Sequence, residues 1–121
     1  MSKIFIIDDD KLITTIYSDF FATRGHIVSS TNSSFGVSNG IRTLEPDVVI
    51  QDMNLPGLSG QGLLNVIDSN ESVKVVLISG DSQESAMQDL VESGKAHGYF
   101  IKGEPLDKLG RKISSLLGQG V

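Results

Sequence analysis

The stretch Ile4-Phe5-Ile6-Ile7-Asp8-Asp9-Asp10 is a short apolar run that ends in three carboxylates. Three later runs also end in a residue able to bind phosphate or metal: Val48-Val49-Ile50-Gln51 before Asp52, Val75-Val76-Leu77-Ile78 before Ser79, and Tyr99-Phe100-Ile101 before Lys102. Continuously apolar runs are typical of parallel strands that are covered on both faces. Because the carboxyl ends of parallel strands share one edge of a sheet, we expect these side chains to meet in one crevice.

The spacing of the apolar runs indicates the fold class. Runs recur near residues 5, 28, 49, 76 and 100, which leaves room for a crossover helix after each strand. The pattern predicts an α/β fold, a single doubly wound (βα)5 domain with a five-stranded parallel sheet. We expect the strand order 2-1-3-4-5, which is that of flavodoxin-like folds. We expect the domain to span residues 1–118, with 119–121 as a tail or the stump of a linker. A complete small protein and one domain of a longer chain both fit this pattern.

Helical periodicity between the runs predicts which positions are buried. For the first helix these positions are Leu12, Ile13, Ile16 and Phe20; for the second they are Phe35, Val37, Ile41 and Leu44. Ser59 predicts the N-cap of a third helix, and the pair Asp81 and Glu84 predicts the capped start of a fourth. The last helix has the most regular apolar stripe, formed by Leu106, Leu109, Ile113, Leu116 and Leu117.

Composition excludes several classes of protein. The net charge of −5 argues against nucleic acid as a partner, because proteins that bind phosphate backbones normally present a basic face. The absence of cysteine excludes disulfides and thiolate metal sites. The N-terminus has no apolar stretch long enough for a signal peptide or a membrane span. We therefore expect a cytoplasmic protein that does not associate with membranes.

The acids at the predicted crevice indicate a metal ion. Asp8, Asp9 and Asp10 could cap the following helix, but three aspartates exceed what capping requires. Two carboxylates ~4 Å apart repel by about 4 kcal/mol at an effective dielectric constant of 20. With Asp52 facing the same cluster, a hard cation such as Mg²⁺, Mn²⁺ or Ca²⁺ is favoured over zinc.

The other residues at this edge each have an ordinary interpretation beside the functional one. Asp52 could serve only as a turn former before Pro56-Gly57, or it could act as a metal ligand, a nucleophile or both. Ser79 could be a turn residue and Lys102 a solvated lysine, yet in one crevice both could bind an anionic oxygen. His26 and His97 each precede an apolar run, at the edge of the predicted sheet opposite the acids, and an ordinary structural role is favoured for both.

At these residues the chain resembles the receiver domains of bacterial response regulators over essentially its whole length. The matching stretches are residues 6–10, 46–57, 76–80 and 98–102. The resemblance implies that Asp52 accepts a phosphoryl group from a histidine kinase or phosphotransfer protein. It implies that Asp8, Asp9, Asp52 and the carbonyl of Asn54 hold Mg²⁺, with Mn²⁺ also plausible. It also implies that Ser79 and Lys102 bind the phosphoryl oxygens.

The same resemblance implies how the signal leaves the domain. Ser79 and Tyr99 would reorient together and reshape the face built from the fourth helix, fifth strand and fifth helix, for an output protein or an attached effector domain. Asn54 and Asp81 would set a moderate-to-fast rate of phosphate loss. The domain would not be an enzyme, although Mg²⁺-dependent self-phosphorylation from small donors and autodephosphorylation are expected. A monomer or a weak homodimer is expected.

Three positions depart from the family pattern, and none removes a site residue. Gly103 replaces the usual proline after the lysine, so we predict a trans Lys102–Gly103 bond and a looser loop. Gln51 replaces an apolar residue, so its amide should find a hydrogen-bond partner or reach the edge of the strand. Gly80 should leave more open space than the common alanine.

Three other functions fit parts of the sequence. Asp8-Asp9-Asp10-Lys11-Leu12 resembles the start of haloacid-dehalogenase-type phosphatases, but Leu12 breaks that motif and no acidic pair follows Lys102. A flavin-phosphate module would need a first loop rich in Ser, Thr and Gly rather than three aspartates. A receiver fold that serves as an interaction module without phosphorylation remains a serious alternative.

Overall fold

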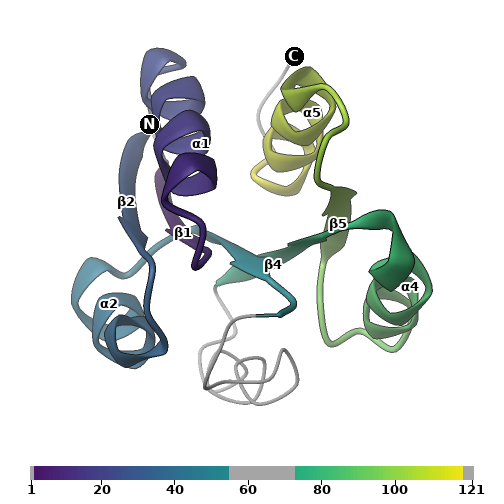
Figure 1. The fold of residues 1–121 in the computed structure, drawn as a ribbon. Helices are drawn as coiled ribbons and strands as arrows, with labels where there is room; N and C mark the ends of the chain where they lie inside the picture. The colour runs from purple at the N-terminus through teal and green to yellow at the C-terminus, as the bar shows by residue number, and fades with distance from the viewer. Residues whose placement is uncertain (1, 55–72, 119–121) are drawn as a thin grey trace.

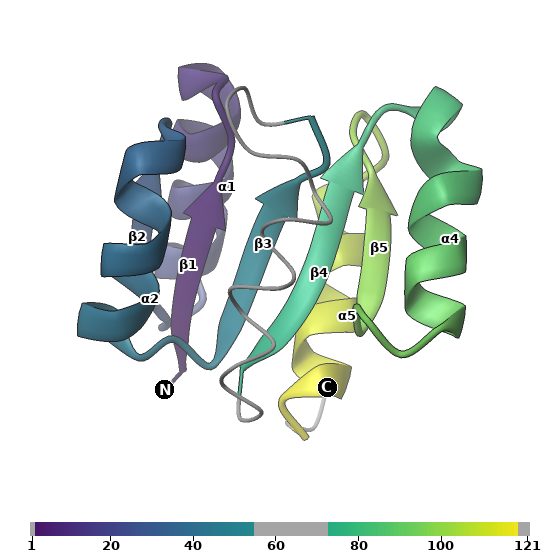
Figure 2. The same ribbon diagram turned by 90° about the horizontal axis from the view of Figure 1, so that it is seen from below.

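The sheet has the predicted order. A computed structural model describes residues 2–54 and 73–118 of the chain, and its five parallel strands are arranged β2-β1-β3-β4-β5 (Figure 1). The strands are β1 (Lys3–Ile7), β2 (Ile27–Thr31), β3 (Val48–Asp52), β4 (Lys74–Ser79) and β5 (Gly98–Ile101). Because all five strands are parallel, their carboxyl ends lie at one edge of the sheet, where Figure 2 shows the arrowheads of β1, β3, β4 and β5. The fold predicted from the apolar runs is confirmed.

Helices cover both faces of the sheet. The described helices are α1 (Lys11–Thr23), α2 (Val37–Leu44), α4 (Glu84–Glu92) and α5 (Leu106–Leu116), with short 3₁₀ turns η1 (Ser34–Gly36) and η2 (Asp81–Gln83). α1 and α5 lie on one face, and α2 and α4 lie on the other (Figure 1). None of these described helices is long and apolar enough to cross a membrane. The predicted third helix and its N-cap at Ser59 lie outside the described residues.

The alternation of side chains along each strand creates two apolar layers. Phe5 and Ile7 of β1 pack with α2 and α4, while Ile4 and Ile6 pack with α1 and α5. All four side chains are almost completely buried. Burial on both faces explains why the sequence of β1 is apolar throughout rather than alternating.

The predicted buried face of α1 is partly wrong: Ile13 and Phe20 pack against the core as expected, but Leu12 and Ile16 do not. Leu12 and Ile16 are 65% and 44% exposed, whereas Thr14, Tyr17 and Phe21 are buried. The larger aromatic rings bury more apolar area than the two aliphatic side chains, so they decide which way the helix faces. Thr14 can be buried because its hydroxyl oxygen accepts a hydrogen bond from the Nδ2 atom of Asn32 at 3.0 Å.

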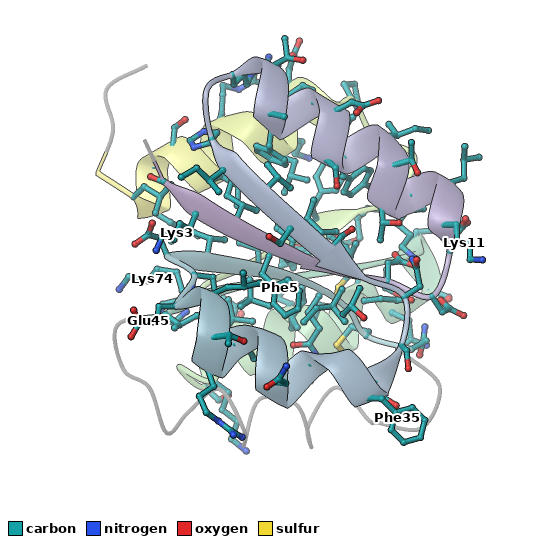
Figure 3. The ribbon with its side chains drawn as sticks, turned by 90° about the vertical axis from the view of Figure 1, so that its left-hand side faces the viewer. Lys3, Phe5, Lys11, Phe35, Glu45 and Lys74 are labelled. Carbon is teal, nitrogen blue, oxygen red and sulfur yellow. The ribbon has the colours of Figure 1, made fainter. Side chains whose placement is uncertain are left out.

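Two other local predictions are also wrong. Phe35 does not pack in the core: it lies in η1, it is 96% exposed, and its ring projects away from the body of the molecule (Figure 3). Asp81 does not cap α4. It begins the turn η2, whose N-cap is Gly80, and neither η2 nor α4 has a side-chain cap. A 3₁₀ turn before α4 has therefore moved the start of the helix to Glu84.

Candidate functional site

The predicted crevice forms at the carboxyl edge of the sheet. Asp8 directly follows β1, Asp52 ends β3, Ser79 ends β4, and Lys102 directly follows β5. The first three residues are 0%, 4% and 2% exposed, respectively. Four strands that are distant in sequence thus place two buried carboxylates, a buried hydroxyl and a partly buried ammonium at one edge.

The ammonium of Lys102 forms ion pairs with both buried carboxylates. The Nζ atom of Lys102 lies 2.7 Å from Oδ2 of Asp8 and 3.5 Å from Oδ2 of Asp52. Burial raises the pKa of Asp8 above its ordinary value, although Lys102 and the backbone N–H of Asp10 oppose this change. Burial alone would lower the pKa of Lys102, but the two carboxylates together raise it. The lysine is therefore held in its charged form.

The three consecutive aspartates have separate roles. Asp10 is the N-cap of α1, and its Oδ1 atom accepts a hydrogen bond from the backbone N–H of Leu12 at 2.9 Å. Asp8 and the exposed Asp9 instead form a cluster with Asp52, in which one carboxylate oxygen from each lies within 4.8 Å of the others. The capping interpretation therefore accounts for one aspartate, and the remaining two acids join Asp52.

Asn54 connects the Asp52 carboxylate with the Ser79 hydroxyl. Its backbone N–H donates to Oδ1 of Asp52 at 3.1 Å, and its Nδ2 atom donates to Oγ of Ser79 at 3.1 Å. An oxygen that accepts from the amide must direct its own proton elsewhere, so Asn54 orients the Ser79 hydroxyl as a donor. The side-chain bond to Ser79 was not anticipated from the sequence.

Asn32 is a second residue that the sequence analysis missed. Its Nδ2 atom donates to the backbone oxygen of Asp8 at 2.8 Å as well as to Thr14. It thereby fixes the chain between β1 and α1, where Asp8 and Asp9 lie. Its position in the sequence could have indicated this role, because Asn32 directly follows β2 at the same edge of the sheet.

The turn after β5 has the predicted trans peptide bond. The structure contains no cis bond among its described residues, and Gly103 has φ = +97°. The backbone N–H of Lys102 donates to the carbonyl of Ser79 at 2.8 Å, which ties the turn to β4. Proline, whose ring fixes φ near −65°, could not adopt the Gly103 conformation. The turn that presents Lys102 therefore has a backbone that differs from a proline turn.

The other two departures from the family pattern have opposite outcomes. No atom of the described part of the chain lies within 4 Å of the position a Cβ would take at Gly80, so the expected open space is present there. Gln51 is 1% exposed, and neither atom of its amide has a hydrogen-bond partner within residues 2–54 and 73–118. The expectation for Gln51 is wrong, because its neighbours in the adjacent strands are the aliphatic Ile7 and Leu77.

Tyr99 of β5 pairs with Leu77, two residues before Ser79, and its hydroxyl is held by a contact outside the crevice. Its hydroxyl donates to Oε2 of Glu84 at 2.9 Å, which raises the pKa of the tyrosine. The Nζ atom of Lys112 donates to the backbone oxygen of Tyr99 at 2.6 Å and lies 4.8 Å from the centre of its ring. Asp81 lies at the start of η2 and is exposed to solvent.

The two histidines have structural environments away from this edge. The Nδ1 atom of His97 accepts a hydrogen bond from the backbone N–H of Val75 at 3.0 Å, and the backbone N–H of His97 donates to the oxygen of Val75. His97 therefore joins the beginning of β5 to β4. Burial lowers the pKa of His26.

Comparison with known proteins agrees with this geometry. The profile of the family described as "Response regulator receiver domain" matches residues 4–114. The transcriptional regulatory protein KdpE of Staphylococcus aureus is 27% identical over 112 residues, which cover 93% of this chain and 48% of that protein. Sporulation initiation phosphotransferase F of Bacillus subtilis is 27% identical over 124 residues, covering 95% of this chain and 93% of that protein.

Solved structures are similar over the same length. The receiver domain of the TMAO respiratory system response regulator TorR is 25% identical, with a TM-score of 0.87 and 98% of each chain covered. The chain spans about half the length of several curated relatives that it matches, KdpE among them. Fold, strand-end residues and family profile agree, and the chain belongs to the receiver domain family of the response regulators of two-component signalling.

Proposed function

We propose that Asp52 is the residue that accepts the phosphoryl group. The observation that carries this proposal is the environment of its carboxylate, which is 4% exposed at the carboxyl edge of the sheet and 3.5 Å from the ammonium of Lys102. Asn54 holds the second carboxylate oxygen by its backbone N–H and the Ser79 hydroxyl by its side chain. A carboxylate with a fixed orientation, beside an ammonium and a hydroxyl, is suited to phosphoryl transfer.

The chemistry of the transfer follows from these positions. A carboxylate oxygen of Asp52 forms the new bond to phosphorus as the bond from phosphorus to the donor breaks. Negative charge spreads over the phosphoryl oxygens in the transition state. Lys102 and the Ser79 hydroxyl stabilise that charge, and both groups are positioned before the reaction begins.

The acids at the site fit a divalent cation. Asp8, Asp9 and Asp52 bring three carboxylates together against the single ammonium of Lys102, and their oxygens suit Mg²⁺, or Mn²⁺ in its place. These three residues and the carbonyl of Asn54 would hold the ion, which would neutralise charge on the phosphoryl oxygens when bound. The response regulator TrrA of Thermotoga maritima, which has the same fold, was solved in complex with Mg²⁺-BeF.

We propose that the output follows from Ser79 and Tyr99. Contact with a phosphoryl group would draw the Ser79 hydroxyl inward, and Tyr99 would leave Glu84 as the face formed by α4, β5 and α5 rearranges. A difference of a few kcal/mol between two conformations suffices for such a switch. Asn54 and Asp81 would set the rate at which water removes the phosphoryl group.

The partners follow from the same role. A histidine kinase or a phosphotransfer protein would supply the phosphoryl group in the cytoplasm, and an output protein or an attached effector domain would receive the signal. Residues 1–118 would form the domain, with 119–121 as its tail or linker, in a monomer or weak homodimer. Beyond self-phosphorylation and autodephosphorylation, no enzymatic turnover is proposed.

The test is the intact mass of the protein after incubation with acetyl phosphate and Mg²⁺. We expect the mass of one phosphoryl group to be added to the wild type and none to Asp52→Asn, which keeps the shape of the side chain but lacks the nucleophile. A gain that persists in the variant, or no gain in the wild type, would contradict the proposal. The second result would favour the interaction module that works without phosphorylation.

A further inference from the structure

Phe35 is the most exposed large apolar side chain among the described residues. It is 96% exposed in η1, immediately before α2, and its ring projects into solvent (Figure 3). The other exposed side chains of this kind within residues 2–54 and 73–118 are Leu12, Ile16 and Ile27, which are between 44% and 65% exposed. A large apolar ring left in water is a ready contact for another molecule.

A small pocket lies at the other end of α2. Its volume is about 160 Å³, and its walls come from β1, β2, the last turn of α2 and Pro46. Phe5, Ile27 and Leu44 contribute apolar surface to it, and Ile27 is half exposed. A cavity of about 150 Å³ can hold a benzene molecule. The pocket therefore has room for one phenyl ring.

The ring and the pocket cannot meet within one chain. Phe35 lies before the first residue of α2, and Leu44 is its last residue. The roughly nine residues between them span about 13 Å of helix, which is longer than a phenylalanine side chain. Figure 3 shows Phe35 near one end of α2, and Lys3 and Glu45 near the other. Each copy of the chain thus presents both an exposed ring and an open pocket.

We propose that two copies of the chain form a dimer in which each Phe35 ring enters the pocket of the other copy. A two-fold axis perpendicular to α2 places the two α2 helices side by side and antiparallel. The amino end of each helix then lies against the carboxyl end of the other. Both ring-to-pocket contacts form together, and the interface closes without leaving a free ring or pocket.

The charges at the two ends of α2 are complementary in this arrangement. Glu45 and Arg42 are exposed at the carboxyl end of the helix, whereas residues 32–41 carry no charged side chain. In the antiparallel pair, the carboxylate of Glu45 lies near the amino end of the partner's α2, where a negative charge is favourable. The guanidinium of Arg42 lies beside the ring of the partner's Phe35, to which it is attracted. Parallel helices would instead place each of these charges beside its own copy.

The area of the contact predicts a weak dimer. Burial of two phenyl rings, with the pocket walls that they cover, removes on the order of 600–1,000 Å² from water. This total is close to the lower limit of about 1,000 Å² for a specific interface. We therefore expect monomer and dimer to exchange, with the dimer formed at high protein concentration.

Analytical ultracentrifugation of the full chain between about 10 μM and 1 mM measures this association. The samples contain no phosphodonor, so the result does not depend on the acceptor role of Asp52. Salt near 0.15 M screens the repulsion between copies that each carry a net charge of −5. The variants are Phe35→Ala and the matched control Leu12→Ala, which removes an exposed apolar side chain from α1. The urea midpoint of each variant reports whether its fold is intact.

We expect the sedimentation coefficient of the wild type to rise with concentration towards that of a dimer. Phe35→Ala should raise the dissociation constant about a hundredfold, because each dimer loses two buried rings, and Leu12→Ala should leave it unchanged. A wild type that remains monomeric over the whole concentration range would overturn the proposal. Equal association of the wild type and Phe35→Ala, or equal losses in the two variants, would also overturn it.

Disulfide trapping tests the antiparallel arrangement, and the chain has no native cysteine to interfere. Ser34→Cys places a thiol beside Phe35, and Thr43→Cys places one on the wall of the pocket. Under mild oxidation, a mixture of these two variants should form a cross-linked dimer, and addition of Phe35→Ala to both should abolish it. A mixture of Ser34→Cys with Thr15→Cys, on the exposed side of α1, is the control.

Equal cross-linking in the control mixture would refute the assigned contact. A chain that carries both Ser34→Cys and Thr43→Cys should form only a closed dimer, because the two-fold axis satisfies both thiols of each copy. A ladder of larger species in that double variant would refute the two-fold arrangement.

Discussion

Gly103 and Gly80 form a matched pair that tests the backbone of the lysine turn. Among the described residues, no atom lies within 4 Å of the position that a Cβ would occupy at either glycine, so alanine meets no steric clash there at either site. They differ in backbone conformation, because Gly103 has φ = +97° and Gly80 has φ = −71°. The two alanine substitutions therefore isolate the cost of a positive φ.

The expected effects have opposite signs. An L-residue in the left-handed region costs about 1–2 kcal/mol, so Gly103→Ala should lower the free energy of unfolding by about that amount. Gly80→Ala keeps a conformation that alanine tolerates and restricts the unfolded chain, so it should raise that free energy by about 0.4–1 kcal/mol. Gly103→Pro should lower it further than alanine does, because the ring cannot reach φ = +97°.

Urea denaturation of each variant measures these differences. The midpoint should shift at constant m-value, since neither substitution changes the surface buried in the native state. Equal shifts in Gly103→Ala and Gly80→Ala, or stabilisation by Gly103→Pro, would refute the assignment of a positive φ to the turn that carries Lys102.

Three further predictions follow from other described contacts. Partial burial and the nearby charge of Lys74 lower the pKa of His97 below its ordinary value of 6.5. The unfolded chain therefore binds a proton at this histidine more readily than the native protein does, so the free energy of unfolding should be highest above about pH 6.5 and should decrease as the pH falls through the native pKa. In His97→Asn, Oδ1 of the asparagine can accept the same N–H of Val75 but does not titrate, so thermal unfolding should depend less on pH than in the wild type. An equal loss of stability at low pH in the variant and the wild type would contradict the role of His97. Gly40→Ala should destabilise the fold by about 1–3 kcal/mol, because its Cβ would lie 2.5 Å from the buried ring of Phe5; an unchanged urea midpoint would show that the ring can move aside. Lys102→Gln should slow phosphorylation by acetyl phosphate about 10²-fold, measured by the time course of intact mass, and an unchanged rate would exclude the lysine from transition-state stabilisation.

The sheet and the site edge could be predicted because their signals are local and redundant. β1, β3, β4 and β5 each contain a run of apolar residues, and the chemistry-bearing residue ends the strand or directly follows it. Parallel topology then brings Asp8, Asp52, Ser79 and Lys102 together without further information. The separation of Asp10, which caps α1, from Asp8 needed the backbone geometry, because three adjacent aspartates look equivalent in sequence.

Other features depend on competition between residues and could not be predicted from pattern alone. Leu12 and Ile16 have helical spacing, but Tyr17 and Phe21 take the core-facing positions of α1. The contacts made by the Asn54 and Asn32 amides depend on χ angles and on strands distant in sequence. Gln51 also differs from expectation. Buried amides normally have hydrogen-bond partners, but the amide of Gln51 has none among the described residues.

The double contact made by Asn54 has a consequence for how such a domain can evolve. One residue holds the Asp52 carboxylate through its backbone and the Ser79 hydroxyl through its side chain. A substitution there that altered the persistence of the signal would also alter the resting state of the switch. Under the roles proposed for Asn54 and Ser79, a change in the lifetime of the phosphoryl group would be inherited together with a change in the switch, and selection for one would constrain the other.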